Sequence, residues 1–399
     1  MSNIGIIGGG HSSGKLTQHL INGNFKGNIK IFSEEDSPPY ERPPLSKEYL
    51  EGTKSIKDLE LKINFEKEIQ LFLNSRIENI NLEKKTIVDK NNNKYEFDKI
   101  VFASGARPRK INFREREGIC YLRNLKDSII IKDKLLNSKN IVIAGAGYIG
   151  LEVASTIRKK YPSKNITIIE SSENILNRNA NDNLRNYIKN MHIENNVNLI
   201  LNSKIEIING LKKIESLVLN NSTELTCDLL IVGIGVKPNT EIIQETSIFN
   251  ESGILINEYC ETKIKDIYAI GDITYFNSKY FKNYVREESW NNAEKQSYVL
   301  AQNLLGIKKS YNEIPWFWTN QYDNNIQILG DIMNYDNYAK KIYDSKKITQ
   351  VFFKDQKLKG IFTVNNGKDI SMAKQIIKDD KKIDFNNIDT NNLDLKSLY

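Results

Sequence analysis

The stretch IVIAGAGYIGLEVA, residues 141–154, decides the fold of this chain. Its first four residues are an apolar strand pattern, its glycines complete a GxGxxG turn, and residues 151–160 continue as a helix. A second strand pattern, residues 166–169, ends in Glu170. Glycines let the backbone approach a pyrophosphate, the helix N-terminus stabilises its charge, and the acid accepts ribose hydroxyls. The stretch therefore predicts a dinucleotide-binding βαβ unit.

The same pattern occurs at the N-terminus. Residues 4–7 are an apolar strand pattern, GGGHSSG follows at 8–14, and residues 15–21 have helical periodicity. A second strand, 29–32, is followed by Glu34 and Glu35. One glycine motif is weak evidence, but two copies framed by strand, helix, strand and acid predict two nucleotide-binding folds. Ser13 replaces the third glycine of this copy, and a small side chain can still fit there.

The rest of the chain suggests where the domains change. Strand patterns at 100–103 and 229–232 each enter a Gly- and Pro-containing segment, as expected where the chain crosses between domains. Residues 267–272 form a buried-strand pattern ending in an acid, and an amphipathic helix follows from about 290 to 305. Short strands and aromatic clusters begin at 310, a last helix is predicted at 370–378, and the Asn- and Asp-rich end at 384–394 is predicted to be loose.

Composition excludes several classes of protein. The 399 residues carry 57 Lys and Arg against 50 Asp and Glu, a net charge of +7, with the lysines scattered along the chain. The scattered charge favours an acidic protein partner over nucleic acid. With 39% hydrophobic residues and 22 Gly against 8 Pro, the overall composition is that of a globular protein and disfavours collagen, coiled coil and general disorder. No apolar run reaches the roughly 20 residues that span a bilayer, and the N-terminus enters a strand directly. We expect a soluble, cytoplasmic protein without a membrane partner.

The cysteines do not form a redox pair. Cys120, Cys227 and Cys260 are far apart in sequence, so no CxxC dithiol, disulfide scaffold or metal site is expected. The three histidines, His11, His19 and His192, all lie in the first half, so none is a C-terminal acid-base partner for a thiol. Hydride transfer between a nicotinamide and a flavin needs no general base.

Several segments, in order along nearly the whole chain, resemble the FAD-dependent NADH:ferredoxin reductase family, whose members serve Rieske-type dioxygenases and haem-thiolate monooxygenases. The most specific are RPPLSK at residues 42–47 and PWFW at 315–318. The others are residues 102–109, 121–125, 145–152, 233–240, 267–272 and 288–290.

This resemblance implies an α/β fold of the glutathione-reductase type. It has two doubly wound Rossmann-type domains, for FAD and NADH, and a small α+β C-terminal domain. The implied boundaries are 1–110 with 237–309 for a discontinuous FAD domain, 111–236 for the NADH domain and 310–399 for the C-terminal domain.

The resemblance and the motifs also assign site residues. FAD would be bound by Gly8, Gly10, Ser13, Glu34, Arg42, Lys47, Ala103, Arg109, Asp272, Trp290 and Trp318. NADH would be bound by Gly145, Gly147, Tyr148, Ile149, Gly150, Glu152, Glu170 and Gly235. Lys47, beside the flavin N5, and its partner Glu152 would be the catalytic pair, because a cation near N5 stabilises reduced flavin.

Each of these assignments has a structural alternative. Lys47 could be a solvated surface lysine and Glu152 a first-turn acid favoured by the helix dipole. Asp272 could be a turn former, and Phe317 could pack in the core while Trp316 and Trp318 share the other face of a strand.

Glu170 favours NADH over NADPH, because a carboxylate accepts ribose hydroxyls but repels a 2'-phosphate. The expected reaction is hydride transfer from NADH to FAD, then single-electron transfer to an acidic [2Fe-2S] ferredoxin that supplies an oxygenase. One alternative is a reductase of rubredoxin, quinone or a small oxidant. Another is a redox-sensing flavoprotein resembling apoptosis-inducing factor. The chain is expected to be a monomer or homodimer, with no metal site.

Overall fold

The computed structural model describes residues 2–65, 68–177 and 180–398. Contacts group the chain into two compact units. Unit 1 comprises Met1–Arg42, Ile56–Arg107 and Val236–Pro315. Unit 2 comprises Pro43–Ser55, Pro108–Gly235 and Trp316–Tyr399. The chain passes between the units close to both of the predicted crossovers; the exact domain boundaries remain a prediction.

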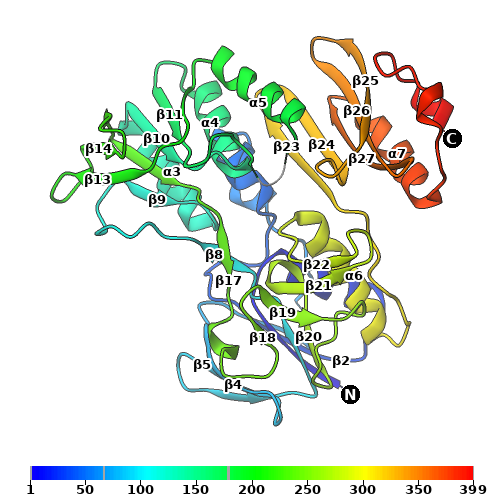
Figure 1. Cartoon of the computed structure of the whole chain (residues 1–399). Helices are drawn as coiled ribbons and strands as arrows, with labels where there is room; N and C mark the ends of the chain where they lie inside the picture. Colours follow the sequence, from blue (N-terminus) through cyan, green and yellow to red (C-terminus); the bar gives the residue numbers. More distant parts are fainter. Residues whose placement is uncertain (1, 66–67, 178–179, 399) are drawn as a thin grey trace. The chain divides into compact units, whose positions relative to one another are not determined.

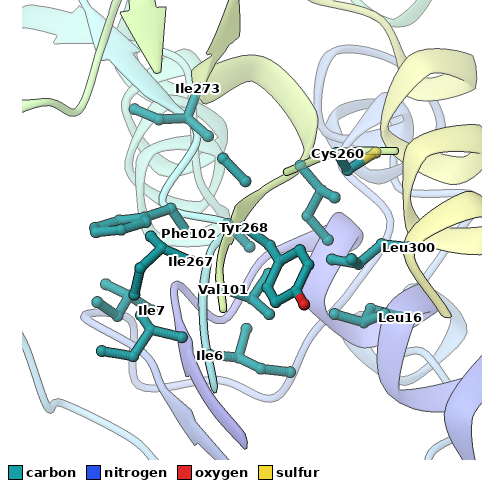
Figure 2. Packing of buried hydrophobic residues seen from close by; sticks show 14 of the residues in the cluster. Ile6, Ile7, Leu16, Val101, Phe102, Cys260, Ile267, Tyr268, Ile273 and Leu300 are labelled. Atoms are coloured by element: carbon teal, nitrogen blue, oxygen red, sulfur yellow. The ribbon is translucent and has the colours of Figure 1, made fainter. Parts of the chain in front are cut away.

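Unit 1 is built on a five-stranded parallel sheet in the order β20-β7-β1-β2-β3. The buried positions of β1, β2, β7 and β20 are apolar, with Ile4, Ile6, Ile31, Val101 and Ile267 all 0% exposed, as expected for strands in the core of a parallel sheet. In Figure 2, Leu16 and Leu300 pack beside Ile6, Val101 and Tyr268 of this sheet. The bounds are β1 Ser2–Ile7, β2 Gly27–Phe32, β3 Ile69–Phe72, β7 Lys99–Phe102 and β20 Ile267–Ala269.

Helices α1 (His11–Asn22) and α6 (Trp290–Leu304) pack against each other in this unit. Two antiparallel pieces complete it. One is the three-stranded β4 (Ile77–Asn81), β5 (Thr86–Asp89) and β6 (Lys94–Glu96); the other, which also contains a parallel pair, has β18 (Phe249–Asn250), β19 (Gly253–Ile256), β21 (Thr274–Ser278) and β22 (Asn283–Val285). A two-stranded sheet of β8 (Ala106–Pro108) and β17 (Val236–Pro238) forms where the chain crosses.

Unit 2 repeats the parallel architecture in the order β12-β11-β10-β16-β9. The strands β10 (Asn140–Ala144) and β16 (Leu229–Val232) lie at its centre, and four of the five β10 residues are buried. The other elements are β9 Ile119–Tyr121, α3 Leu125–Asn137, α4 Tyr148–Lys160, β11 Asn165–Ile169, α5 Asp182–Glu194, β12 Asn198–Ile200 and the meander β13 Ile205–Asn209, β14 Ser216–Leu219, β15 Glu224–Thr226.

The C-terminal segment of unit 2 is an antiparallel sheet in the order β23-β24-β27-β26-β25, packed on α7 (Gly367–Asp379). Figure 1 shows α7 beside β27. Residues of this sheet share one apolar cluster with α4 and α5. Its strands are β23 Trp316–Gln321, β24 Asn324–Gly330, β25 Asn337–Asp344, β26 Lys347–Lys354 and β27 Lys357–Val364. Two parallel nucleotide folds and a C-terminal α+β segment confirm the predicted fold class.

Two sequence predictions need correction. Both helices that follow glycine turns start earlier than periodicity indicated, at His11 and Tyr148, because the glycine before each serves as the N-cap. The end at 384–394 is not loose in the described residues, because Leu393 is buried, Phe385 contacts the Phe353 ring and Asn392 pairs with Lys341. Widely spaced apolar anchors in a polar stretch leave no periodic signal.

None of the helices formed by the described residues has the length and apolarity required to span a membrane.

Candidate functional site

The first glycine turn joins β1 to α1 in a conformation that glycine favours. Gly8 has φ +114°, and a Cβ there would lie 2.3 Å from the Ala103 carbonyl oxygen. Ser13 is fully buried, and its hydroxyl donates to the Gly10 carbonyl at 2.8 Å, so serine fits the position of the third glycine. Gly10 is the N-cap, and no side chain of the described chain caps this helix. Its first amides are therefore available to a phosphate.

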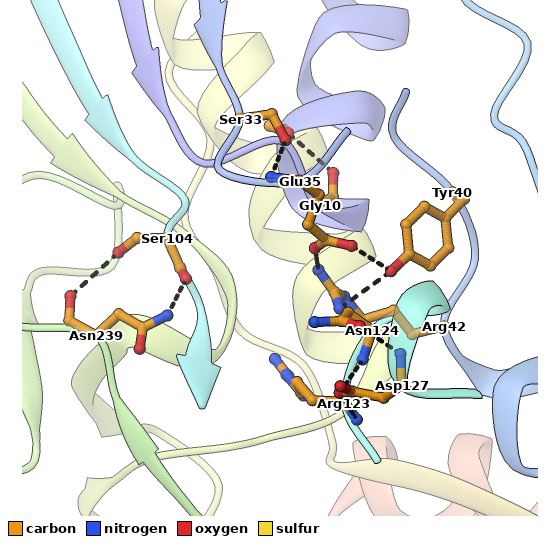
Figure 3. Close-up of polar contacts among 11 residues, drawn as sticks. Gly10, Ser33, Glu35, Tyr40, Arg42, Ser104, Arg123, Asn124, Asp127 and Asn239 are labelled. Carbon is orange, nitrogen blue, oxygen red and sulfur yellow. Dashed lines mark hydrogen bonds and ion pairs between the residues drawn. The ribbon is translucent and has the colours of Figure 1, made fainter. Parts of the chain in front are cut away.

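The acids after β2 have different surroundings. Glu34 is exposed, and its carboxylate pairs with Arg76 at 3.2 Å. Glu35 accepts from Tyr40 and Arg42, both at 2.5 Å, as Figure 3 shows. Burial lowers the pKa of Arg42, but Tyr40, Glu35 and Asp272 together hold it above its usual value. The structure thus brings Arg42 and Asp272 near one another, and the ribose role of Glu34 stays a prediction.

The other predicted FAD residues of unit 1 lie at strand and helix ends. Ala103 follows β7 and donates its amide to the Ile7 carbonyl at 2.8 Å. Asp272 lies in the 3₁₀ turn that directly follows β20. Trp290 is the first residue of α6, and its ring centroid lies 5.3 Å from that of His11. Parallel strands β7 and β20 therefore end at one sheet edge with Ala103 and Asp272, where ligands of such sheets bind.

Next to Ala103, the turn after β7 is fastened to a segment far along the chain. The Asn239 side-chain amide donates to the Ser104 carbonyl at 2.7 Å, as drawn in Figure 3. In unit 2, Asn124 and Asp127 form a capping box that begins α3, also visible there. These contacts hold the chain where it enters and leaves the nucleotide folds.

The second glycine turn fits a pyrophosphate as well. A Cβ on Gly150 would lie 2.2 Å from the Gly145 carbonyl oxygen, whereas a Cβ on Gly147 would meet nothing within 4 Å. Gly147 caps α4 without a side-chain acceptor from the described residues. The Glu170 carboxylate accepts the amides of Ala146 and Ser172, both at 2.9 Å, so it is held at the tip of β11. This is the place at which an acid recognises an adenosine ribose.

The remaining predicted nucleotide residues lie around this turn. Ile149 is exposed on α4. Gly235 accepts the Arg109 amide at 2.9 Å; Arg109, predicted to bind FAD, is exposed and lies in unit 2. The structure places these residues in unit 2 without assigning them a ligand, so their roles stay predictions.

Lys47 and Glu152 form a buried ion pair within unit 2. Their Nζ and Oε2 atoms lie 2.8 Å apart, and Lys47 and Glu152 are 8% and 2% exposed. Lys47 follows a 3₁₀ turn, Pro43–Ser46. Two hydroxyls hold this turn: Ser128 donates to the Leu45 carbonyl and Thr156 donates to the Ser46 carbonyl. A solvated surface lysine is excluded, because this cation is desolvated and paired.

Two residues of this pair's surroundings were missed by sequence reasoning. The Ser46 hydroxyl donates to Glu152 Oε2 at 2.5 Å, and the Thr319 hydroxyl donates to Oε1 at 2.7 Å. Ser46 lies inside the RPPLSK segment, and Thr319 directly follows the PWFW segment at 315–318. Nothing in their spacing marks them, because Thr319 lies 167 positions from Glu152.

The aromatic run on β23 divides between two faces, as predicted. The Trp316 and Trp318 rings stack with centroids 5.1 Å apart. Phe317 packs against Tyr148 of α4 at 4.5 Å. Phe317 is therefore a packing residue, and Tyr148, predicted to contact NADH, is also a structural neighbour of the C-terminal sheet.

All three cysteines are buried and free. Burial raises the pKa of the Cys120 thiol to about 11 and that of Cys227 to about 12, and it also raises that of Cys260. Such thiols are neither thiolates nor reachable near pH 7.

Comparison with known proteins agrees with this geometry. Residues 2–297 match the model of the pyridine nucleotide-disulphide oxidoreductases, and residues 316–399 match the reductase C-terminal model. The chain belongs to the pyridine nucleotide-disulphide oxidoreductase family. The family uses FAD and NADH, and the two glycine turns described above fit them.

Individual relatives extend over the whole chain. A 3-phenylpropionate/cinnamic acid dioxygenase ferredoxin–NAD(+) reductase component of Photorhabdus laumondii is 29% identical, over 93% of this chain and 95% of the relative. Putidaredoxin reductase of Pseudomonas putida is 28% identical, over 99% and 96%. These family members are ferredoxin reductases.

Two solved structures are similar along the same length. The covalent putidaredoxin reductase–putidaredoxin complex matches with a TM-score of 0.91 and 27% identity, covering 96% of this chain and 95% of that one. The ferredoxin reductase for the CYP199A2 system of Rhodopseudomonas palustris matches with a TM-score of 0.92 and 28% identity, covering 100% and 99%.

Proposed function

We propose that this protein is an NADH-dependent ferredoxin reductase, which passes electrons from NADH through FAD to a [2Fe-2S] ferredoxin that supplies an oxygenase. The observation that carries the proposal is the buried Lys47–Glu152 pair in a chain with two dinucleotide turns and no available thiol. The full-length similarity to ferredoxin reductases supports it.

In this proposal the first turn, with Gly8, Gly10 and Ser13, holds the FAD pyrophosphate, and the second, with Gly145 and Gly147, holds that of NADH. Bound FAD supplies a ring that accepts a hydride and releases single electrons. Lys47 provides a fixed positive charge for the negative charge that develops on reduction. Glu152 holds that lysine in place and keeps its charge compensated when water is excluded.

The state of the cysteines supports an acceptor outside the chain. Members of this family are named for disulphide chemistry, but here each thiol is buried with a raised pKa, as described above. Because only a thiolate attacks a disulfide, none of the three can relay electrons. The relatives' names supply the acceptor that fits, since a putidaredoxin reductase is joined to putidaredoxin in a solved complex.

Charge supports an acidic partner. The chain carries a net charge of +7, which attracts an acidic ferredoxin over distances comparable to the Debye length. A cytoplasmic location belongs to the same proposal, because unpaired cysteines persist in a reducing compartment.

The proposal is tested by anaerobic stopped flow. The protein reduced with NADH is mixed with a [2Fe-2S] ferredoxin, and flavin reoxidation is followed by absorbance. We expect the ferredoxin to reoxidise it faster than rubredoxin or a quinone, with a rate that falls about tenfold or more between low and high salt as steering is screened. Treatment with iodoacetamide should leave the rate unchanged.

Other outcomes select the alternatives. If rubredoxin or a quinone reoxidised the flavin quickly and no ferredoxin did, the electron acceptor would be rubredoxin or the quinone instead of a ferredoxin. A long-lived reduced complex with NAD⁺ and slow turnover with all acceptors would favour the redox-sensing protein. Loss of turnover on alkylation would refute an electron path without sulfur.

A further inference from the structure

The Glu152 carboxylate is held from two sides. Its Oε2 atom accepts hydrogen bonds from the Lys47 ammonium and the Ser46 hydroxyl, both in the segment just before α2 (Glu48–Glu51). Its Oε1 atom accepts a hydrogen bond from the Thr319 hydroxyl, on β23 of the C-terminal sheet. The carboxylate is thus the point at which the Lys47 segment and the C-terminal sheet meet.

Behind Thr319, a line of buried polar side chains leads to α5. Gln321 Nε2 lies 3.1 Å from Thr319 Oγ1, and Gln321 Oε1 lies 2.9 Å from His192 Nε2. The other ring nitrogen, His192 Nδ1, lies 3.1 Å from the Tyr322 hydroxyl. Thr319, Gln321 and His192 are each 0% exposed.

The chemistry of these groups sets one direction for every bond. The Gln321 carbonyl oxygen only accepts, so His192 carries its proton on Nε2. Burial lowers the pKa of His192 to about 4, so the ring is neutral and Nδ1 accepts from Tyr322. The Gln321 amide then donates to Thr319, whose hydroxyl proton is left for Glu152. Each donation therefore points toward the carboxylate.

We propose that Thr319, Gln321 and His192 are positioning residues for the Lys47–Glu152 pair: a one-way chain of hydrogen bonds through which the C-terminal sheet holds Glu152 in place for Lys47. The inference rests on the proposed function, because it assigns these residues to the same reaction. Hydrogen bonds in series polarise one another, so the last donor in this chain is stronger than an isolated hydroxyl.

An alternative role as buried structural polar groups predicts a different response. Thr363, on β27 of the same sheet, is also 0% exposed, but its hydroxyl has no hydrogen-bond partner among the described residues. Thr319 and Thr363 therefore form a matched pair of buried threonines in which only Thr319 donates to Glu152.

The experiment compares Thr319→Val with Thr363→Val and Thr319→Ser in the FAD-loaded protein. We expect Thr319→Val to lower the limiting rate of flavin reduction by NADH about tenfold, as for a lost hydrogen bond to a buried charge. The flavin midpoint potential, measured against a reference dye, should become more negative. Thr319→Ser should recover both values, and Thr363→Val should change neither.

A double variant shows whether Thr319 acts through Glu152. In a Glu152→Gln background, Thr319→Val should slow flavin reduction no further. Wild-type protein that NADH cannot reduce would refute the proposed function itself. This inference alone would be overturned by a different result, in which NADH reduces the wild-type protein normally. In that result Thr319→Val and Thr363→Val have the same thermal stability, the same rate of flavin reduction and the same flavin midpoint potential.

The direction of the chain has its own measurement, independent of turnover. With only three histidines, ¹⁵N imidazole spectra are simple, and His192→Gln assigns the resonance. We expect His192 to be the neutral Nε2–H form from pH 8 down to pH 5, since its pKa lies about 4, and to become charged only below that. An Nδ1–H form, or a charged ring at pH 6, would show that the bonds do not run toward Glu152.

Discussion

Lys47→Met is expected to slow flavin reduction by NADH about 100-fold, the effect of removing one preorganised group that stabilises developing negative charge. It should also destabilise the protein by about 3 kcal/mol, because it leaves the buried Glu152 carboxylate without its cation. Stopped-flow reduction at saturating NADH and urea unfolding measure the two effects separately.

A double variant separates the loss of stability, caused by an unpaired buried charge, from the loss of rate, caused by the missing lysine. Lys47→Met with Glu152→Gln removes both charges, so we expect most of the stability to return while the rate stays low. Lys159→Met is the control, since Lys159 is exposed and its Nζ lies 3.6 Å from Glu51 and 3.7 Å from Asp323. If Lys47→Met reduced flavin at the wild-type rate, the pair would be structural only.

Glu170→Ala is expected to weaken NADH binding about 10- to 100-fold, the loss of hydrogen bonds to a charged acceptor. NADPH binding should change less or improve, because the carboxylate that repels a 2'-phosphate is gone. The preference for NADH therefore narrows. Dissociation constants of both nucleotides, measured by titration of the FAD-loaded protein, give the ratio.

Comparing NADH with NADPH also shows whether Glu170→Ala disturbs the second glycine turn itself. Glu170 holds Ala146 and Ser172, so a collapsed turn would weaken NADH and NADPH equally. The control is Glu173→Ala, an exposed acid nearby, which should leave both constants unchanged. If Glu170→Ala left the dissociation constants of both NADH and NADPH at their wild-type values, another residue would bind the ribose.

The nucleotide folds could be predicted because their signals are local. The glycine turns, the apolar strands and the terminal acids lie within short spans, and each strand predicted from them is present. Helix α6 was also predicted, from its amphipathic pattern, and the structure shows that Ser289 caps it. The strand β25 gives no clear strand signal in the sequence, because five of its eight residues are exposed and it has few apolar positions.

The site was only partly predictable. Lys47 and Glu152 were paired through resemblance, since their residue types alone equally suit a solvated lysine and a helix-dipole acid. The difference between Glu34 and Glu35 was not visible, because it depends on Tyr40 and Arg42 reaching back to the second acid.

By itself, the sequence determined the kind of protein: two βαβ nucleotide folds, an acid at the end of a strand at Glu170 and no cysteine pair, since each of these depends on neighbours in the chain. Only the tertiary structure decided how Glu152 is held. Its partners come from positions 105 residues before it and 167 after it, and the donors behind Thr319 lie on a strand and a helix that packing brings together. A hydrogen bond needs atoms within about 3 Å, and no spacing rule spans such separations.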